Sequence, residues 1–189
     1  MIRRTFLVLT VALAALSPGV GPALAQFDTM TLKPIVKAVR EGDEDKVRSA
    51  LLKGENANQI DTSGQPLLMV AVVAGQIGVV ETLLKGGAFP DTMDKDGNTS
   101  LIRAAEKGDV DIVEILLAKN AKVDAQTRQG ATALSIAARR GHAEIVRALL
   151  AKKADPNKAD FTGRTPLAYA RQTSKPTIEA MLRKAGARD

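Results

Sequence analysis

The sequence contains no cysteine and no tryptophan, and it has one histidine and one tyrosine. The lack of cysteine excludes disulfides and thiolate metal sites, so stability has to come from packing. Aromatic residues make up only 3% of the 189 residues. Alanine and leucine carry the apolar content instead, which favours closely packed helices. With 25% charged and 45% hydrophobic residues, the composition is that of an ordinary folded, soluble protein, and the length predicts one domain.

The sequence has a single long apolar run, which lies at the N-terminus. Residues 6–16 form this run, which a single threonine interrupts, and Arg3 and Arg4 precede it. Small residues follow at Ala23 and Ala25. This order is typical of a cleavable secretory signal peptide, and the run is too short for a permanent membrane span. We expect cleavage after Ala25; an uncleaved N-terminal anchor is the alternative.

The route of export stays open between two systems. The pair Arg3-Arg4 resembles a twin-arginine signal. The strongly apolar run that follows favours the general secretory route, which we expect. Removal of residues 1–25 lowers the net charge from +6 to +4, because these two arginines are the only charged residues in that segment. No further long apolar segment follows, so we expect a soluble mature chain in the periplasm of a Gram-negative bacterium.

A period of 33 residues organises the remaining sequence. It appears in glycines at 64, 97, 130 and 163, in leucines at 68, 101, 134 and 167, and in alanines at 71, 104, 137 and 170 and at 88, 121, 154 and 187. Glycine occupies only 15 positions, so four matches by chance at one spacing would be rare. We therefore divide the chain into a cap unit (26–60), a first unit (61–93), a second unit (94–126), a third unit (127–159) and a last, C-terminal capping unit (160–189).

Each unit is predicted to form two short helices. In the second unit, apolar residues recur at helical spacing on both sides of Gly108. A glycine at this position is suited to end the first helix, because it adopts a left-handed conformation at little cost. One helix pair cannot bury its apolar face alone, whereas stacked neighbours bury it together. The expected fold is therefore an all-α solenoid of stacked helix-turn-helix units joined by β-hairpin-like loops.

Several short motifs carry a family resemblance. They are TPL at 165–167, GH at 141–142, IV and LL within 145–150, and ADPN at 154–157. These units resemble ankyrin repeats, whose 33-residue pattern combines TPLHxAA, GH, IVxxLL and GAxxN elements. The resemblance covers about residues 31–189 and comprises about five repeats. It implies a turn followed by a helix pair in each unit.

The sequence departs from the family pattern at the histidine of TPLH. Met69, Ile102, Ser135 and Ala168 replace it, and the first unit has Pro66 where threonine is expected. The hydrogen bonds that this histidine would make are therefore missing. We expect the hairpin tips, above all that of the first unit, to be held less firmly.

The single histidine, His142, precedes Glu144 and raises the question of catalysis or metal binding. Its position is filled by Gln76, Asp109 and Lys175 in the other units, all at the start of a second helix. We therefore interpret it as a structural position where a polar side chain serves free helical N–H groups. A metal site lacks further ligands, since no second histidine or cysteine exists.

Other catalytic arrangements are equally absent. No Ser-His-Asp set has a credible context, and the glycines form neither GxGxxG nor GxxxxGK[ST]. The paired carboxylates of Asp109 and Asp111 fit the start of a helix, where negative charge suits the dipole. We expect no catalytic residue, no cofactor and no metal, and thus no enzyme.

The resemblance implies a protein-binding surface, because the tips and first helices of ankyrin stacks line a concave face. The positions on this face vary between units, whereas the packing positions do not. We expect the face to be apolar near Val73 and basic toward the C-terminal half, with Phe161 as an aromatic anchor and Tyr169 as a second candidate. The candidate binding residues are Arg103, Lys107, Arg128, Arg139, Arg140, Phe161 and Arg164.

The predicted function is a non-enzymatic protein-interaction scaffold, expected to be monomeric, whose partner carries an anionic surface. Three alternatives stay open: the arginines only keep the protein soluble, the chain binds polyanions or an anionic membrane surface, or it protects or inhibits an exported enzyme. Nucleic acid is disfavoured, because export removes the chain from it and few aromatics are available for stacking on bases.

Overall fold

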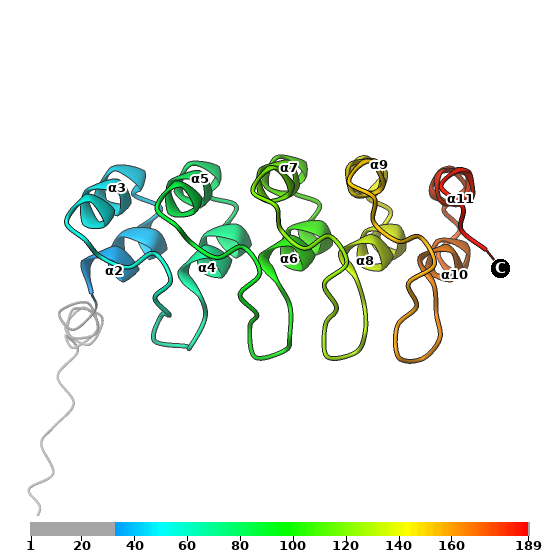
Figure 1. The fold of residues 1–189 in the computed structure, drawn as a ribbon, viewed down its shortest axis with the longest axis horizontal. Coiled ribbons are helices and arrows are strands. Elements are labelled where there is room, and N and C mark those ends of the chain that lie inside the picture. The colour runs from blue at the N-terminus through cyan, green and yellow to red at the C-terminus, as the bar shows by residue number, and fades with distance from the viewer. Residues whose placement is uncertain (1–32, 189) are drawn as a thin grey trace, which may run out of the picture. The chain divides into compact units, whose positions relative to one another are not determined.

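Ten α-helices, arranged in five pairs, form the part of the chain described by the computed structural model, residues 33–188 (Figure 1). The predicted signal peptide, residues 1–25, lies outside the described residues. The first helices are α2 (Pro34–Glu41), α4 (Leu67–Ala74), α6 (Ser100–Lys107), α8 (Ala133–Arg140) and α10 (Pro166–Gln172). The second helices are α3 (Glu44–Leu52), α5 (Ile77–Lys85), α7 (Val110–Ala118), α9 (Ala143–Ala151) and α11 (Pro176–Lys184). Figure 1 shows the two sets as parallel rows, with loops projecting on the side of the first helices. The predicted all-α solenoid is confirmed.

The end of each first helix is set by a left-handed residue. Gly108 caps α6 with φ of 87°, and Gly141 caps α8 with φ of 88°. The last unit lacks this glycine, and Ser174 takes the same place with φ of 53°. The abrupt reversal after the first helix therefore follows from one residue per unit, as the sequence predicts.

The start of the first helix is fixed by a threonine in three units. The hydroxyls of Thr99, Thr132 and Thr165 each accept a hydrogen bond from the backbone N–H three residues later. In the third unit, Ser135 accepts a bond in return, from the N–H of Thr132 to its hydroxyl at 3.0 Å. The first unit has Pro66 here and no side-chain cap. Its weaker hold on the loop remains a prediction.

The leucines and alanines that carry the 33-residue period lie in the core. Leucines 68, 101, 134 and 167 and alanines 71, 104, 137 and 170 are all buried. The alanines let neighbouring first helices approach closely, and the leucines fill the space between them. The second helices at the two ends bury fewer residues than those between them. Helix α3 buries only Val47 and Ala50, and α11 buries only Ile178 and Leu182.

Each junction between units is closed by one side chain that accepts a hydrogen bond from the backbone of the next unit. The acceptors are Asn58, Asp91, Asp124 and Asn157, which bind the N–H groups of Phe89, Lys122, Asp155 and Arg188 over 2.7–3.0 Å. The two asparagines also donate to the carbonyls of Gly87 and Gly186. These are the residues of the GAxxN element and its equivalents, and they hold the units in register.

Candidate functional site

Four tip loops, residues 61–66, 94–99, 127–132 and 160–165, project beside the first helices (Figure 1). Each is closed by the side chain of its first residue, which accepts hydrogen bonds from backbone N–H groups two and four residues later. In the second tip loop the Asp94 carboxylate binds the N–H groups of Asp96 and Asn98 at 2.9 and 2.8 Å. In the third, the Thr127 hydroxyl does the same at 3.2 Å each. The tips are thus held without the family's histidine.

The tip aspartates are buried, so each needs a compensating donor. Asp94 receives two hydrogen bonds from the guanidinium of Arg103, at 2.7 and 3.2 Å. Asp160 receives the hydroxyl of Tyr169 at 2.5 Å, and Tyr169 occupies the same helical position as Arg103. Asp61 receives Arg40 of the preceding unit at 3.3 Å.

The third unit has neither the tip aspartate nor the donor on its first helix. Thr127 replaces the tip aspartate, and the buried Ile136 replaces the donor on the helix. The two changes match, because an uncharged tip residue needs no cation. Sequence reasoning missed this pairing. The residue three places before each tip glycine indicates it, because this residue is aspartate in three units and threonine in the third unit.

Hydrogen bonding keeps the tip carboxyls ionised. Burial opposes ionisation of Asp94, but hydrogen bonds from Arg103 and Asn98 outweigh it and lower the pKa of this carboxyl. Burial likewise opposes ionisation of Asp160, yet Thr162 and Tyr169 hold its pKa well below the usual range. Burial, together with the bond to Asp160, raises the pKa of Tyr169.

We expect Asp94→Asn to lower the free energy of unfolding by about 1–3 kcal/mol at pH 7, because Arg103 loses a charged acceptor. The folded pKa lies below the unfolded value of about 4, so this stabilisation is complete above pH 4 and is lost as pH falls through the folded pKa. Urea unfolding at pH 7 and pH 3 measures the difference, which should shrink in acid. Glu114→Gln, at an exposed position in the middle of α7, is the control. An equal loss at both pH values would contradict the role of ionised Asp94.

Several predicted binding residues prove to be engaged in holding the fold. Arg103, with 29% of its side chain exposed, also contacts Glu106 at 3.3 Å. Arg140 binds the other oxygen of Glu106 at 2.7 Å, across the two units. Lys107 donates to the carbonyl of Val73 at 2.7 Å and lies 3.2 Å from the carboxylate of Asp109. Arg164 lies 3.6 Å from Asp160. The expected basic face is therefore largely neutralised at these four positions.

Two predicted arginines keep their charge uncompensated. Within residues 33–188, neither Arg128 nor Arg139 forms an ion pair. The guanidinium of Arg139 lies 5.6 Å from the centre of the Tyr169 ring, and that of Arg164 lies 4.9 Å from it. Tyr169 is only 5% exposed, so the expectation that it serves as an exposed anchor is wrong. Its ring is instead a buried support for these cations.

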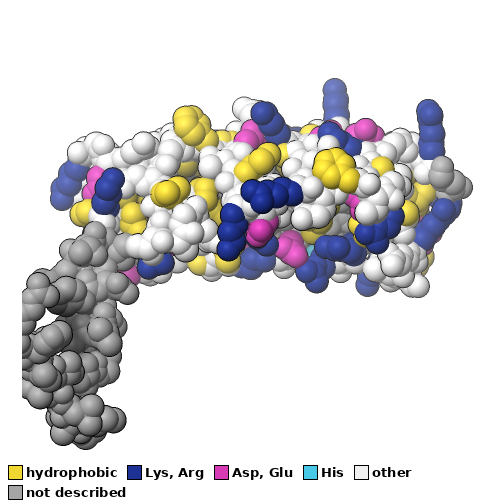
Figure 2. Space-filling view, turned by 90° about the horizontal axis from the view of Figure 1, so that it is seen from below, with side chains coloured by type: hydrophobic (Ala, Val, Ile, Leu, Met, Phe, Trp, Pro, Cys, Tyr) yellow, Lys and Arg dark blue, Asp and Glu magenta, His cyan; other side chains and the backbone are white. Residues whose placement is uncertain are grey.

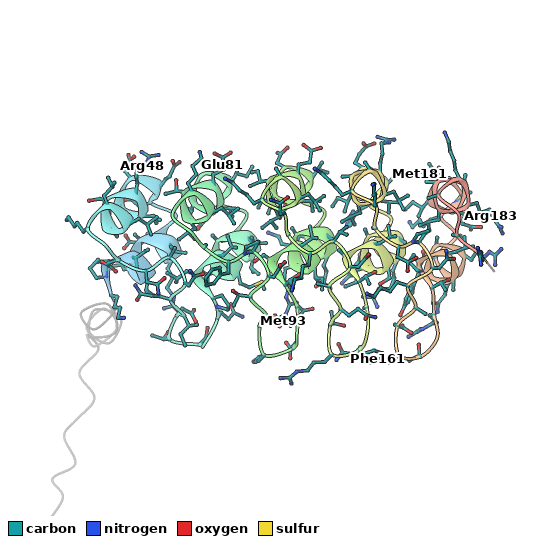
Figure 3. All side chains as sticks on the ribbon, in the orientation of Figure 1. Arg48, Glu81, Met93, Phe161, Met181 and Arg183 are labelled. Atoms are coloured by element: carbon teal, nitrogen blue, oxygen red, sulfur yellow. The ribbon has the colours of Figure 1, made fainter. Side chains whose placement is uncertain are left out.

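Phe161 lies at the outer end of the last tip loop and is 72% exposed (Figure 3). Its backbone N–H donates to the carbonyl of Gln129 at 3.0 Å, and its ring approaches Gly130. The N–H of Arg128 makes the equivalent bond to Asp96 at 3.4 Å. These bonds join the second, third and last tip loops into a ladder. Figure 2 views this side of the molecule, where apolar and basic side chains share the surface.

Comparison with protein families decides the classification. A family model described as ankyrin repeats (3 copies) matches residues 35–127 and 121–188. The chain belongs to the ankyrin-repeat family. Ankyrin repeats generally mediate protein–protein interaction, which agrees with a scaffold. No curated protein matches the chain.

In this ankyrin-repeat protein, His142 is a structural residue, as predicted, but it does not cap a helix. It makes no side-chain cap on α9, so the expectation that it serves N–H groups there is wrong. The ring lies against Gly108 of the preceding unit, and its Nε2 is 3.3 Å from the carbonyl oxygen of Glu106. Gln76 and Lys175 lie in the same way against Gly42 and Gly141. The position is structural, but it packs between units.

The ankyrin repeats also bear on metal binding and on membrane insertion. Among the described residues, no cluster of three or more histidine, aspartate or glutamate side chains is arranged to hold a metal ion. No helix of residues 33–188 combines the length and apolar character that crossing a membrane requires.

Proposed function

We propose that this ankyrin-repeat protein is a non-enzymatic scaffold that binds a protein partner through its tip loops and the adjoining face of its first helices. The observation that carries the proposal is the exposure of Phe161 on a fixed tip loop. An aromatic side chain exposed over 72% of its surface sits on a loop fixed to its neighbour by a backbone hydrogen bond. A rigidly held aromatic ring is a typical interface hot spot, since little entropy is lost when it binds.

The charges around Phe161 support a partner with an anionic surface. Arg128 belongs to the neighbouring tip loop and Arg139 to α8, and neither has a carboxylate partner among the described residues. Such charges accelerate encounter with an anionic surface and orient it. At the other end, Val73 is 46% exposed, so the face offers an apolar contact near the first unit.

The proposal is tested by affinity capture. The full chain, purified after export, is immobilised and incubated with periplasmic extract, and captured proteins are identified by mass spectrometry. We expect one protein to be enriched and Phe161→Ala to reduce its capture by about tenfold or more. The matched control is Phe89→Ala, which removes an aromatic ring of similar exposure (66%) from the segment that follows α5. Equal capture by the wild type and Phe161→Ala would contradict the proposed surface.

The same protein preparations distinguish the scaffold from a binder of polyanions. Heparin and vesicles rich in anionic lipid are offered in place of the extract. If the protein is a protein-binding scaffold, it should retain neither heparin nor vesicles at physiological ionic strength. Only two described arginines of this face are without a carboxylate partner, which is too little charge for strong binding of a polyanion. Retention of either one, abolished by Arg128→Glu/Arg139→Glu, would favour the polyanion alternative.

We also propose that the scaffold acts in the periplasm, on the strength of the signal-like order of residues 1–25. Expression of the full chain in a Gram-negative host should place it in the periplasmic fraction, with Gln26 as the first residue. The control replaces Leu9 and Leu13 with arginine, which destroys the apolar run and should keep the chain in the cytoplasm. A periplasmic product that begins at Met1 would contradict cleavage, and a cytoplasmic wild type would contradict export.

A further inference from the structure

The third unit differs from its neighbours by lacking a carboxylate in its tip loop. Asp61, Asp94 and Asp160 each lie buried beneath their own loop and meet a donor from a first helix. Thr127 stands at the equivalent position. The second and last units thus pair a tip carboxylate with a donor on their own first helix, and the third unit has neither group.

The third unit also carries a local excess of positive charge. Across the tip loops and first helices, Arg40, Arg103, Arg140 and Arg164 all lie within 4 Å of a carboxylate. Arg128 and Arg139 are the described arginines of the third unit's tip loop and first helix that have none. Both are exposed. An anion brought by a partner would therefore meet two cations that need no other bond to be broken first.

Arg139 is also held in a conformation that suits a carboxylate. Its guanidinium lies over the ring of Tyr169, 5.6 Å from the ring centre, and the hydroxyl of Tyr169 is fixed by Asp160 at 2.5 Å. Attraction to the ring uses none of the guanidinium's hydrogen bonds, so its N–H groups can still donate to a carboxylate. The ring thus reduces the side-chain entropy that a partner would lose in binding Arg139.

Phe161 supplies an apolar contact to the same region. Its N–H is bonded to Gln129, the residue after Arg128, and its ring covers Gly130. The third tip loop is therefore flanked by an exposed aromatic ring on one side and carries Arg128 itself. A ligand that contacts both the arginines and the ring of Phe161 needs a carboxylate next to an apolar side chain.

We propose that the third unit binds a linear acidic-apolar segment of the partner protein, in which an aspartate or glutamate engages Arg139 and Arg128 while an adjacent leucine, isoleucine or phenylalanine packs on Phe161. This inference rests on the proposed protein-binding function and specifies the chemistry of the partner. A folded acidic surface without such a segment would not insert a side chain beside Phe161.

The probe is a phage-displayed library of random 12-residue peptides, selected on the full chain purified after export. We expect the selected peptides to combine an acidic residue with a large apolar neighbour. Fluorescence anisotropy with one selected peptide should show at least about tenfold weaker binding to Arg139→Glu and to Phe161→Ala. The peptide variant with glutamine in place of glutamate should bind the wild type equally weakly. A peptide with arginine at that position should regain affinity for Arg139→Glu.

The control is Arg147→Glu/Lys152→Glu, which reverses two exposed charges on the second-helix side of the same unit. It should bind the peptide as the wild type does, and all variants should show the wild-type circular dichroism spectrum. Selected peptides without acidic enrichment, or binding unaffected by Arg139→Glu, would overturn the acidic-apolar segment while protein binding stands. If no peptide is selected but affinity capture succeeds, the segment is likewise overturned. Failure of both experiments would overturn the proposed function itself.

Discussion

Replacement of Leu117 by alanine should lower the free energy of unfolding by about 2–5 kcal/mol. Leu117 lies near the end of α7 and is 5% exposed. Truncation removes its buried methyl groups and leaves a cavity that the surrounding helices fill only in part. The effect should be large because a solenoid has no single core, so each unit depends on its two neighbours.

Urea unfolding followed by circular dichroism measures this loss. The matched control is Leu52→Ala, since Leu52 ends α3 with 83% of its surface exposed. We expect this control to change stability by no more than about 0.5 kcal/mol. A loss near zero for Leu117→Ala would place the leucine at the surface and contradict the helix register.

The second large effect is expected at Gly130, in the third tip loop. Its φ of +82° suits glycine, and a Cβ placed there would lie 2.7 Å from both the backbone nitrogen and the ring of Phe161. Alanine therefore adds a steric overlap to the cost of a left-handed residue. We expect Gly130→Ala to destabilise the protein by about 2–5 kcal/mol, the sum of about 1–2 for the conformation and 1–3 for the overlap.

Gly163 provides the matched control for this substitution. It occupies the same position of the last tip loop with φ of +83°, but a Cβ placed there would have no neighbouring atom within 4 Å. Gly163→Ala should therefore cost only the conformational part, about 1–2 kcal/mol. The difference between the two variants in urea unfolding measures the contact between neighbouring tips. Equal losses would show that the ladder does not constrain Phe161.

Much of the fold could be predicted from the sequence because packing repeats with the chain. Leu101 and its equivalents must be apolar in every unit, and Gly108 must end the helix, so both recur every 33 residues. Position in the period therefore predicts burial. The exposed Phe161 followed from the same logic, because it stands at a tip position that varies between units.

The candidate site could not be predicted to the same degree, since charge pairing depends on how loops fold onto helices. Arg103 looks free in the sequence, yet the tip loop brings Asp94 against it from nine residues away. Tyr169 looks like an anchor, but it fills the same helical position as Arg103, donates to the tip aspartate Asp160 and is buried. His142 could be identified as structural, but not as a contact between units, because its neighbour Gly108 lies 34 residues earlier.

The junctions between units have a consequence for the length of the protein. Each includes one hydrogen bond between a side chain, such as that of Asp124, and a backbone N–H, such as that of Asp155. Every residue except proline offers such an N–H, so this hydrogen bond places almost no demand on the residue that donates it, and the apolar positions of the period supply the remaining contact. A tandem copy of residues 94–126 would therefore join its neighbours at both ends through bonds already in use. A repeat can therefore be inserted within the stack, and the length of the tip-loop face can change while the core keeps its pattern.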